Sequence, residues 1–448
     1  MAYIKTITVT FDELNLTKPY LRALADLGFT NPTPIQEKAF PVVMSGKDVV
    51  AIAQTGTGKT FAYLLPTLRQ ITFSDQRQPR VIIVVPTREL VVQVVNEIEK
   101  LCAYSTVRYA GIYGGANINP QKQTIYDGLD ILVATPGRLM DMILSRTLQV
   151  HSIQKLIIDE VDEMLNLGFR TQLLSIMDTL PAKRQNLMFS ATLDEDVEKL
   201  IEKYFYQPHY LELVIRGTPL NKIVQKGYFV PNFHTKSNLV KHLLATDTDL
   251  KKVLIFTKNK KLADALYKEL DEAFNSQIGI IHSNKTQPQR FSAIDNFENG
   301  IHRVLIATDI IARGLDIPEV THVINFDTPQ EPGDYIHRIG RTGRADSVGI
   351  SITLINAIEK GFHKNIEALM NKKITILPLP SEVEISDTLT ADERPVKRDK
   401  NLKKMPQIAP KTGGFHEKKD KNKKVNLGGK RRQESEKRKE AAYIRKMR

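Results

Sequence analysis

Short apolar runs, most of them rich in β-branched residues, recur through the first half of the chain, and a longer stretch with helical periodicity follows each one. The runs lie at residues 48–53, 80–86, 130–135, 155–159 and 186–192. Such alternation predicts a parallel sheet whose strands are joined by crossover helices. The connection after Thr87 shows the spacing of a helix packed on a sheet. Its apolar residues are Leu90, Val91, Val95, Ile98 and Leu101.

The same pattern starts again in the second half of the chain. Its apolar runs lie at residues 253–257, 278–282, 303–308, 322–326 and 349–355. A length of 448 residues also exceeds what one compact core usually holds. The sequence therefore predicts two similar α/β domains, at residues 1–207 and 222–380. Residues 208–221 contain Pro208, Gly217 and Pro219, and they are predicted to form a linker that lets the domains move.

The net charge of +13 is concentrated at one end of the chain. Residues 401–448 hold 17 lysine and arginine residues and 5 acidic ones, a net charge of +12. So polar a segment cannot bury enough apolar surface to offset the entropy lost on ordering, and residues 381–448 are predicted to be a disordered basic tail. This tail either binds nucleic-acid phosphates without regard to sequence, or it only keeps the protein in solution.

No stretch approaches the roughly 20 apolar residues that a membrane-spanning helix needs, and the first residues lack the pattern of a secretory signal. Cys102 is the only cysteine, which excludes an intramolecular disulfide and a cysteine-based zinc cluster. These features predict a cytoplasmic protein with no membrane partner.

A phosphate-binding loop is indicated between the first apolar run and the amphipathic stretch after it. Glycines in such a loop let backbone N–H groups approach phosphates, and the following helix adds a favourable dipole. Lys59 is expected to contact the β- and γ-phosphates, and Thr60 to help hold Mg²⁺. The generic pattern has glycine at the position of Ala53, so a turn with only a structural role is the alternative. The residues expected to hold the nucleotide here are Ala53, Gln54, Thr55, Gly56, Thr57, Gly58, Lys59 and Thr60.

Carboxylates follow the apolar run at residues 155–159. Asp159, Glu160 and Asp162 stand at the carboxyl end of a predicted strand, where α/β folds bind their ligands. Alone, such a group is typical of a solvated strand end. Downstream of a phosphate loop, it indicates that Asp159 holds Mg²⁺ through water and that Glu160 orients and deprotonates the attacking water.

Further motifs occur in order around this site. Phe11 precedes Gly28 and Phe29, which lead into the segment PTPIQ at residues 32–36. Later motifs lie at residues 86–90, 114–115, 135–138, 190–192, 307–309, 312–316 and 337–344. Together they resemble the motifs of the DEAD-box RNA helicases, over residues 11 to about 379. The resemblance implies two RecA-like domains of the P-loop NTPase type, with ATP and Mg²⁺ as cofactors and RNA as the partner.

In that family the segment that ends at Gln36 reads the base of the nucleotide. The resemblance implies that the Gln36 amide bonds the adenine edge, because its donor and acceptor match those of adenine, and that Phe11 packs near the base. The site should therefore prefer ATP over GTP. Without the resemblance, residues 32–34 are typical of a turn that enters a helix.

The resemblance also implies positions that bind RNA. Contacts mainly to sugar and phosphate should make binding largely independent of sequence, and reading of 2′-hydroxyl groups should favour RNA over DNA. Arg88 and Arg138 are equally typical of cations at helix ends. The residues expected to contact RNA are Thr87, Arg88, Gly114, Gly115, Thr135, Arg138, Gln287, Arg290 and Thr308.

Residues of the second domain are expected to complete the ATP site. Arg341 and Arg344 resemble arginine fingers that stabilise the charge developing on the γ-phosphate, although a basic helix start has similar spacing. Asp316 is expected to contact the ribose. The residues expected to couple the two domains are Asp162, Ser190, Thr192 and His337.

The implied function is ATP-dependent local unwinding or remodelling of RNA, driven by closure of the two domains. Because ATP and RNA both favour closure, each should tighten binding of the other. Val161 stands where the family name has alanine, and the neighbouring carboxylates are intact. One alternative is a non-catalytic ATP-gated RNA clamp, which the retention of Glu160, Arg341 and Arg344 disfavours. Another is a DNA helicase or translocase, which Gln36 with its upstream Phe11 and the segment at residues 190–192 disfavour. The sequence names neither the RNA nor a protein partner.

Overall fold

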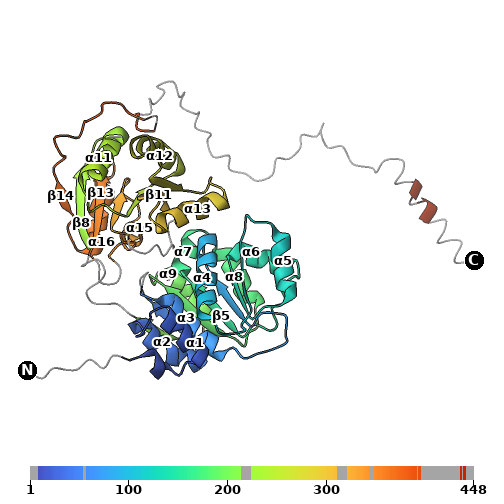
Figure 1. Cartoon of the computed structure of the whole chain (residues 1–448). Coiled ribbons are helices and arrows are strands. Elements are labelled where there is room, and N and C mark those ends of the chain that lie inside the picture. The colour runs from blue at the N-terminus through green and yellow to red at the C-terminus, as the bar shows by residue number, and fades with distance from the viewer. Residues whose placement is uncertain are drawn as a thin grey trace, which may run out of the picture. The chain divides into compact units, whose positions relative to one another are not determined.

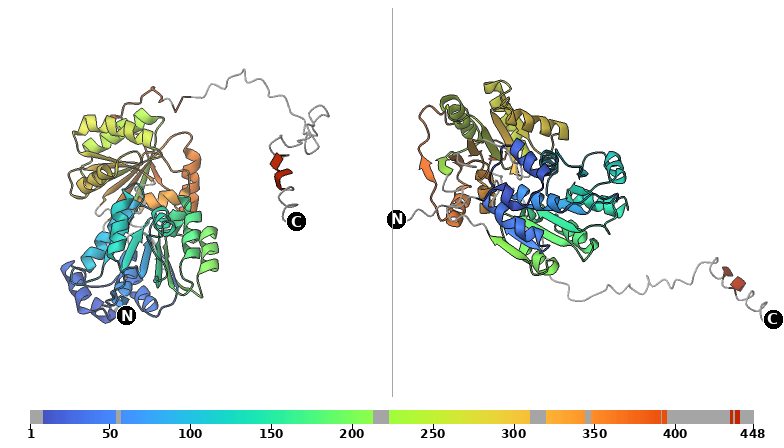
Figure 2. Two further views of the ribbon diagram at one scale, coloured as in Figure 1. Left: turned by 90° about the vertical axis from the view of Figure 1, so that its right-hand side faces the viewer. Right: turned by 60° about the horizontal axis from the view of Figure 1, so that its bottom comes forward.

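The computed structural model describes residues 9–53, 57–212, 223–309, 320–343, 348–390, 392–394, 434–435 and 437–439. Two parallel sheets of seven strands each lie within the unit Met1–Glu393, one in each half (Figures 1 and 2). Each of the ten predicted apolar runs holds a strand. The predicted fold class, two tandem α/β domains with RecA-like parallel sheets, is therefore confirmed. The described segments include no helix with the length and apolar character of a membrane span.

The first sheet has the strand order β3, β4, β2, β5, β6, β1, β7, and every neighbouring pair is parallel. Parallel pairing brings the carboxyl ends of all its strands to one edge, where α/β folds bind ligands. The strands are β1 (Val49–Ile52), β2 (Val81–Val84), β3 (Tyr109–Ile112), β4 (Ile131–Ala134), β5 (Lys155–Asp159), β6 (Gln185–Ser190) and β7 (His209–Glu212).

Helices cover both faces of this sheet, as the nearly continuous apolar runs require. Successive strand residues point to opposite faces: Val49 and Ala51 enter one core, and Val50 enters the other. The first core is covered by η1 (Phe11–Leu14), α1 (Lys18–Asp26), α2 (Pro34–Met44), α3 (Lys59–Gln70) and α4 (Arg88–Leu101). The second face carries α5 (Ile118–Asp127), α6 (Pro136–Leu144), α7 (Val161–Asn166), α8 (Arg170–Thr179) and α9 (Glu195–Tyr204).

The second sheet has the order β10, β11, β9, β12, β13, β8, β14, again wholly parallel. Its strands are β8 (Ile223–Phe229), β9 (Val253–Thr257), β10 (Ile278–Ile281), β11 (Val304–Thr308), β12 (His322–Asn325), β13 (Gly349–Ile355) and β14 (Thr375–Leu377). Its helices are α11 (Phe233–Thr246), α12 (Lys260–Phe274), α13 (Gln287–Glu298), α15 (Pro332–Ile339) and α16 (Lys360–Met370).

The predicted linker at residues 208–221 starts too early. Its residues 209–212 form β7, which pairs with β1 and buries Leu211 in the first core. The apolar content of this strand is low because it lies at the edge of the sheet and only Leu211 is buried along it. Residues 213–222 lie outside the described part of the chain.

The predicted tail boundary at residue 381 is also too early. Val383 is buried in the core that α11 and α12 share, and the backbone N–H of Ser386 donates to Thr235 Oγ1 at 3.0 Å. The Glu393 carboxylate accepts from the backbone N–H of Phe233, at the start of α11, at 2.6 Å. The folded unit therefore continues to Glu393. Disorder of the remaining tail stays a prediction, since most of its residues lie outside the described ranges.

Candidate active site

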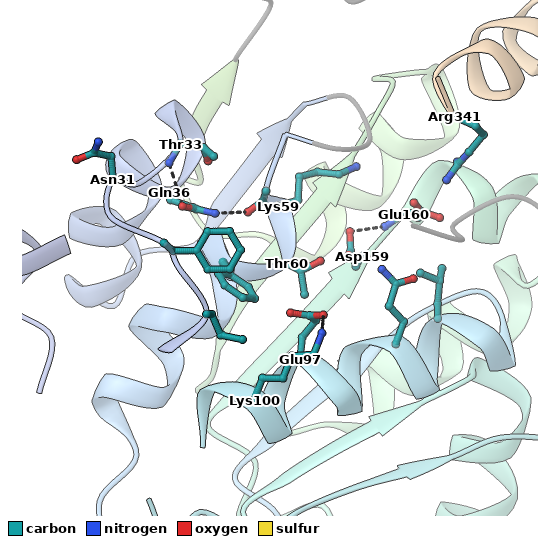
Figure 3. Close-up of a pocket in the computed structure, with 16 residues that line it drawn as sticks. Asn31, Thr33, Gln36, Lys59, Thr60, Glu97, Lys100, Asp159, Glu160 and Arg341 are labelled. Atoms are coloured by element: carbon teal, nitrogen blue, oxygen red, sulfur yellow. Dashed lines mark hydrogen bonds and ion pairs between the residues drawn. The ribbon is translucent and has the colours of Figure 1, made fainter. Parts of the chain in front are cut away.

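A cavity of about 460 Å³ lies at the carboxyl edge of the first sheet (Figure 3). Lys59 and Arg341 point toward the carboxylates at the end of β5. The cavity is also lined by Phe29 and Phe61, which form an apolar wall. The sequence-predicted residues that the structure brings together in its wall are Gln36, Gly58, Lys59, Thr60, Asp159, Glu160 and Arg341.

Lys59 begins α3, directly after a loop residue that must be glycine. Gly58 has φ +86°, and a Cβ atom there would lie 2.5 Å from Gln36 Nε2 and 2.9 Å from Thr33 Oγ1. The Lys59 side chain is 7% exposed, and its Nζ has no hydrogen-bond partner among the described residues. A buried ammonium group is costly unless an anion compensates it. This end of the cavity therefore suits a phosphate.

Gln36 ties α2 to the phosphate-binding loop. Its Nε2 donates to the carbonyl oxygen of Gly58 at 3.2 Å, and its Oε1 accepts from the backbone N–H of Thr33 at 2.9 Å. These two bonds fix which way the amide faces. One N–H and one lone pair of the amide remain for a ligand, which is the pair that adenine requires.

The aromatic residues on the cavity wall are Phe29 and Phe61, whereas Phe11 was predicted to pack near the base. Phe11 is 4% exposed and lies in the first core, outside the cavity lining. Phe29 is 49% exposed and meets Phe61 edge to face, with ring centroids 5.5 Å apart. The signal for Phe29 was its place in the same motif, seven residues before Gln36.

The carboxylates at the end of β5 are buried and close to each other. Asp159 Oδ1 accepts from the backbone N–H of Glu160 at 3.0 Å, and Asp159 Oδ2 accepts from the Tyr63 hydroxyl at 3.1 Å. Glu160 has a left-handed backbone with φ 54°, and its Oε2 has no hydrogen-bond partner within the described segments. Burial raises the pKa of both carboxyls, and the Lys59 charge opposes the rise.

Asp162 connects the end of β5 to the end of β6. Its Oδ2 accepts from the backbone N–H of Ala191 at 3.2 Å and from the backbone N–H and hydroxyl of Thr192 at 3.1 and 3.0 Å. The carbonyl oxygen of Ser190 accepts from the backbone N–H of Ala53 at 2.9 Å. The three predicted coupling residues of the first domain thus lie in one network with the phosphate-binding loop.

Two predicted residues of α15 and its following turn lie near this network. Arg341 is 2% exposed, lines the cavity, and donates from Nε to the carbonyl oxygen of His337 at 3.3 Å. Its charge also opposes the rise in the pKa of Glu160. His337 Nδ1 lies 3.4 Å from Glu163 Oε1 on α7. The predicted site residues outside the described part of the chain are Gln54, Thr55, Gly56, Asp316 and Arg344.

Several predicted RNA-contact residues meet around Glu89, which the sequence reasoning missed. Arg88 donates from Nη1 to Gln287 Oε1 at 3.3 Å, and Gln287 donates from Nε2 to Glu89 Oε1 at 3.3 Å. Arg290 forms an ion pair with the same carboxylate. Gly115 has φ +78°, and a Cβ atom there would collide with the Arg88 guanidinium. Glu89 gave no signal because a first-turn glutamate is ordinary in a helix.

The remaining predicted RNA-contact residues lie at strand and helix ends. Thr87 caps α4, where its hydroxyl accepts from the backbone N–H of Leu90 at 3.3 Å. Thr135 precedes α6 and is buried, and Arg138 donates from Nη2 to the carbonyl oxygen of Ala116 at 3.1 Å. Thr308 ends β11. Gly114 lies in the turn after β3, where a Cβ atom would meet nothing within 4 Å.

Comparison with known proteins identifies the family. The sequence model described as DEAD/DEAH box helicase matches residues 33–200, and the one described as helicase conserved C-terminal domain matches residues 235–346. The ATP-dependent RNA helicase CshA of Listeria monocytogenes is 38% identical over 375 residues, which cover 83% of this chain and 71% of that protein. This chain belongs to the DEAD-box ATP-dependent RNA helicases.

Other relatives of the helicase agree with this membership. The DEAD-box ATP-dependent RNA helicase CshA of Bacillus subtilis is 36% identical, over 84% of this chain and 75% of that one. Dbp5 of S. cerevisiae, solved with RNA and ADP BeF3, has a TM-score of 0.76 at 29% identity, covering 83% of this chain and 96% of that one. Mss116, solved with ssRNA and UDP-BeF, has a TM-score of 0.76 at 29% identity. The match covers 84% of this chain and 81% of that one.

The helicase has a donor set that fits a magnesium–nucleotide complex. Thr60 and Asp159 line the cavity beside the buried Lys59 ammonium. The described residues include no group of three or more His, Cys, Asp or Glu that could hold a metal ion unaided. Mg²⁺ at nucleotide sites is typically bound by one or two carboxylates together with phosphate oxygens. This set therefore fits Mg²⁺ that arrives with a nucleotide.

Proposed function

We propose that the helicase binds ATP with Mg²⁺ in this cavity, hydrolyses it in response to RNA, and uses domain closure to remodel RNA locally. The observation that carries the proposal is that two buried charged atoms, Lys59 Nζ and Glu160 Oε2, have no hydrogen-bond partner in the described structure and belong to residues lining one cavity. Such atoms are rare in folded proteins unless a ligand satisfies them. An amide and an aromatic ring at the other end suit a purine base.

Five polar or charged residues of the cavity then have a role in phosphoryl transfer. Lys59 binds the β- and γ-phosphates, while Thr60 and Asp159 hold Mg²⁺. When bound, Mg²⁺ neutralises charge on the phosphate oxygens. Glu160 orients the attacking water and accepts its proton. Arg341 stabilises the negative charge that develops on the transferred group.

The raised pKa of Glu160 suits a general base. A base works best when its pKa approaches the working pH, because it is then both deprotonated and able to hold the proton. Burial raises the pKa of the Glu160 carboxyl, and the charges of Lys59 and Arg341 keep that rise in check. These two charges favour the carboxylate form that a general base needs.

RNA is proposed to lie along the helix starts that carry the predicted contact residues. The N-termini of α4 and α6 follow Thr87 and Thr135, and such ends present backbone N–H groups and a favourable dipole to phosphates. Contacts of this kind read the backbone and not the bases, so binding should depend little on sequence. Glu89 holds Arg290 and Gln287 in this structure, so these side chains must change partners to reach RNA.

The basic tail is proposed to add affinity for RNA through its charge, and we place the protein in the cytoplasm. The net charge of +12 over residues 401–448 motivates the first proposal. The second follows from the proposed RNA partner, which is found inside the cell. Cell fractionation followed by immunoblotting checks the location; recovery of the protein with the secreted or membrane fraction would contradict it.

Replacing Lys59 tests the nucleotide site. Lys59→Ala should weaken ATP binding by about 100-fold or more, since it removes a charge-assisted hydrogen bond to phosphate from a buried position. Binding of a fluorescent ATP analogue and steady-state ATPase should fall together. Lys38→Ala removes an exposed lysine from α2 and serves as the control. Normal ATP binding and hydrolysis by the Lys59→Ala variant would contradict the assignment of this cavity as the ATP site.

A further inference from the structure

We infer that Tyr63 is a positioning residue, whose hydroxyl fixes the Asp159 carboxylate in the orientation that holds Mg²⁺. The inference rests on the proposed function, which assigns Asp159 to the metal. Tyr63 lies on α3, one turn after Lys59 and Thr60, and its hydroxyl donates to Asp159 Oδ2 at 3.1 Å. Tyr63 therefore contacts the carboxylate that is proposed to hold Mg²⁺.

The ring and the hydroxyl of Tyr63 do different things. The side chain is fully buried, and its ring packs against Phe189 of β6 with centroids 5.2 Å apart. A phenylalanine ring would make the same packing contact. The hydroxyl adds a polar group to a closed core, which is tolerated only where a partner accepts its bond. Here that partner is the carboxylate at the cavity wall.

Both oxygens of Asp159 are held from the protein side. The backbone N–H of Glu160 donates to Oδ1 at 3.0 Å, and Tyr63 donates to Oδ2. Two fixed donors set the plane of the carboxylate and leave its other lone pairs for a ligand. Hydrogen bonds of this kind orient the groups that bind metals, and their removal typically weakens metal binding by about tenfold or more. Without the Tyr63 bond, the carboxylate can rotate about its side-chain torsion.

Tyr63→Phe tests the role, because it removes one hydroxyl and keeps the ring. The matched control is Tyr20→Phe: Tyr20 is also buried, and its hydroxyl donates to the carbonyl oxygen of Leu68 at 3.2 Å, at the other end of α3. Each variant removes one buried hydrogen bond from the same region. They should therefore lower the thermal unfolding midpoint by similar amounts.

The decisive readout needs no turnover. Binding of fluorescent ADP to the full-length protein is titrated at increasing Mg²⁺ concentration, and the Mg²⁺ concentration at half effect is compared between variants. Tyr63→Phe should raise that concentration by about tenfold, while ADP affinity without Mg²⁺ stays at the wild-type value. The Mg²⁺ dependence of ATP hydrolysis should shift in the same direction. Tyr20→Phe should match the wild type in both assays.

The Asp159→Asn variant tests the proposed Mg²⁺ site separately from the role of Tyr63. If Asp159→Asn abolishes the Mg²⁺ effect and Tyr63→Phe leaves it at the wild-type value, the proposed metal site stands and the role of Tyr63 is overturned. If Asp159→Asn leaves the Mg²⁺ effect unchanged, the proposed metal site fails, and the inference fails with it. A shift in Tyr63→Phe alongside a larger one in Asp159→Asn is the expected result.

Discussion

Lys59, Asp159, Glu160 and Arg341 place four formal charges around one cavity, and each side chain is less than 9% exposed. A folded protein usually pairs such groups completely, because burying an ionised group without a partner is costly. Here Lys59 Nζ and Glu160 Oε2 have no hydrogen-bond partner within the described structure. Local frustration of this kind is typical of a functional site, where a ligand supplies the missing partners.

Glu160→Gln should separate ATP binding from hydrolysis. The amide keeps the size of the side chain but cannot accept the proton of the attacking water, so kcat should fall by about 100-fold or more. ATP-dependent retention of RNA should persist, since the binding contacts remain. Steady-state ATPase and filter binding with ATP measure the two effects, and Glu37→Gln, which changes an exposed residue of α2, is the control. Turnover at the wild-type rate would exclude Glu160 as the base.

The pH dependence of hydrolysis should reflect the burial of this base. Because burial raises the pKa of the Glu160 carboxyl above its ordinary 4.5, kcat/KM should fall with decreasing pH from a midpoint higher than that value. Because the base must be deprotonated to accept a proton, activity is present above the raised pKa and lost below it. Circular dichroism at each pH checks that the protein is still folded. A midpoint at or below 4.5 would contradict a buried base.

The sequence predicted those site residues that belong to a recognisable motif of the chain. Lys59 and Thr60 follow their loop directly, Asp159 ends β5, and Glu160 comes next in the chain. Tyr63 was missed because its hydroxyl finds its partner 96 positions away, on another element. Glu89 was missed for the same reason, since it meets Gln287 across 198 positions. The contacts of such residues can be recognised only from the three-dimensional structure.

At the scale of elements, the sequence predicted ten of the fourteen described strands, nine of them inside the sheets and β10 at an edge, and it missed β3, β7, β8 and β14. Central strands are buried on both faces, so they are continuous apolar runs. Three of the missed strands lie at sheet edges, and β8 lies next to an edge, with exposed residues such as Val224 and Phe229. In β3, Gly111 is required because a Cβ atom would lie 2.7 Å from Val91 Cγ1, and that glycine weakens the strand signal.

The segment after β14 gives a test at this scale. A chain that ends at residue 380 should be less stable than one that ends at residue 394, by about 2 kcal/mol or more, because the shorter chain lacks the burial of Val383 and the bond from Phe233 N–H to Glu393. Urea unfolding of both truncated chains measures the difference. Equal stability would show that residues 381–393 do not belong to the folded unit.

At the scale of the whole molecule, the tandem α/β domains followed from the repeated pattern of apolar runs. The start of the tail could not be predicted from that pattern, because the sequence from residue 381 to 393 is polar. Its stability comes from a few specific contacts, such as those of Val383 and Glu393 with α11, and not from a periodic apolar face. Composition therefore predicted a tail but placed its start too early.

Deleting residues 401–448 tests what the tail does. Removal of a net charge of +12 should weaken RNA binding and flatten its dependence on salt, by about 0.7 in the log–log slope for each phosphate of a single strand that the tail no longer neutralises. ATPase without RNA should stay unchanged, since the deleted residues lie outside the folded unit. RNA affinity measured at several salt concentrations decides the question. An unchanged slope would leave the tail as a solubilising segment.

The central claim, that RNA drives ATP hydrolysis in this protein, is tested most directly by its ATPase activity. The full-length chain is assayed without nucleic acid, with single-stranded RNA, and with DNA of matched sequence, at one moderate salt concentration. Stimulation by RNA and not by DNA is the predicted result. Equal stimulation by DNA would contradict the claim in favour of a DNA helicase or translocase, and no hydrolysis under any condition would contradict it in favour of a non-catalytic clamp.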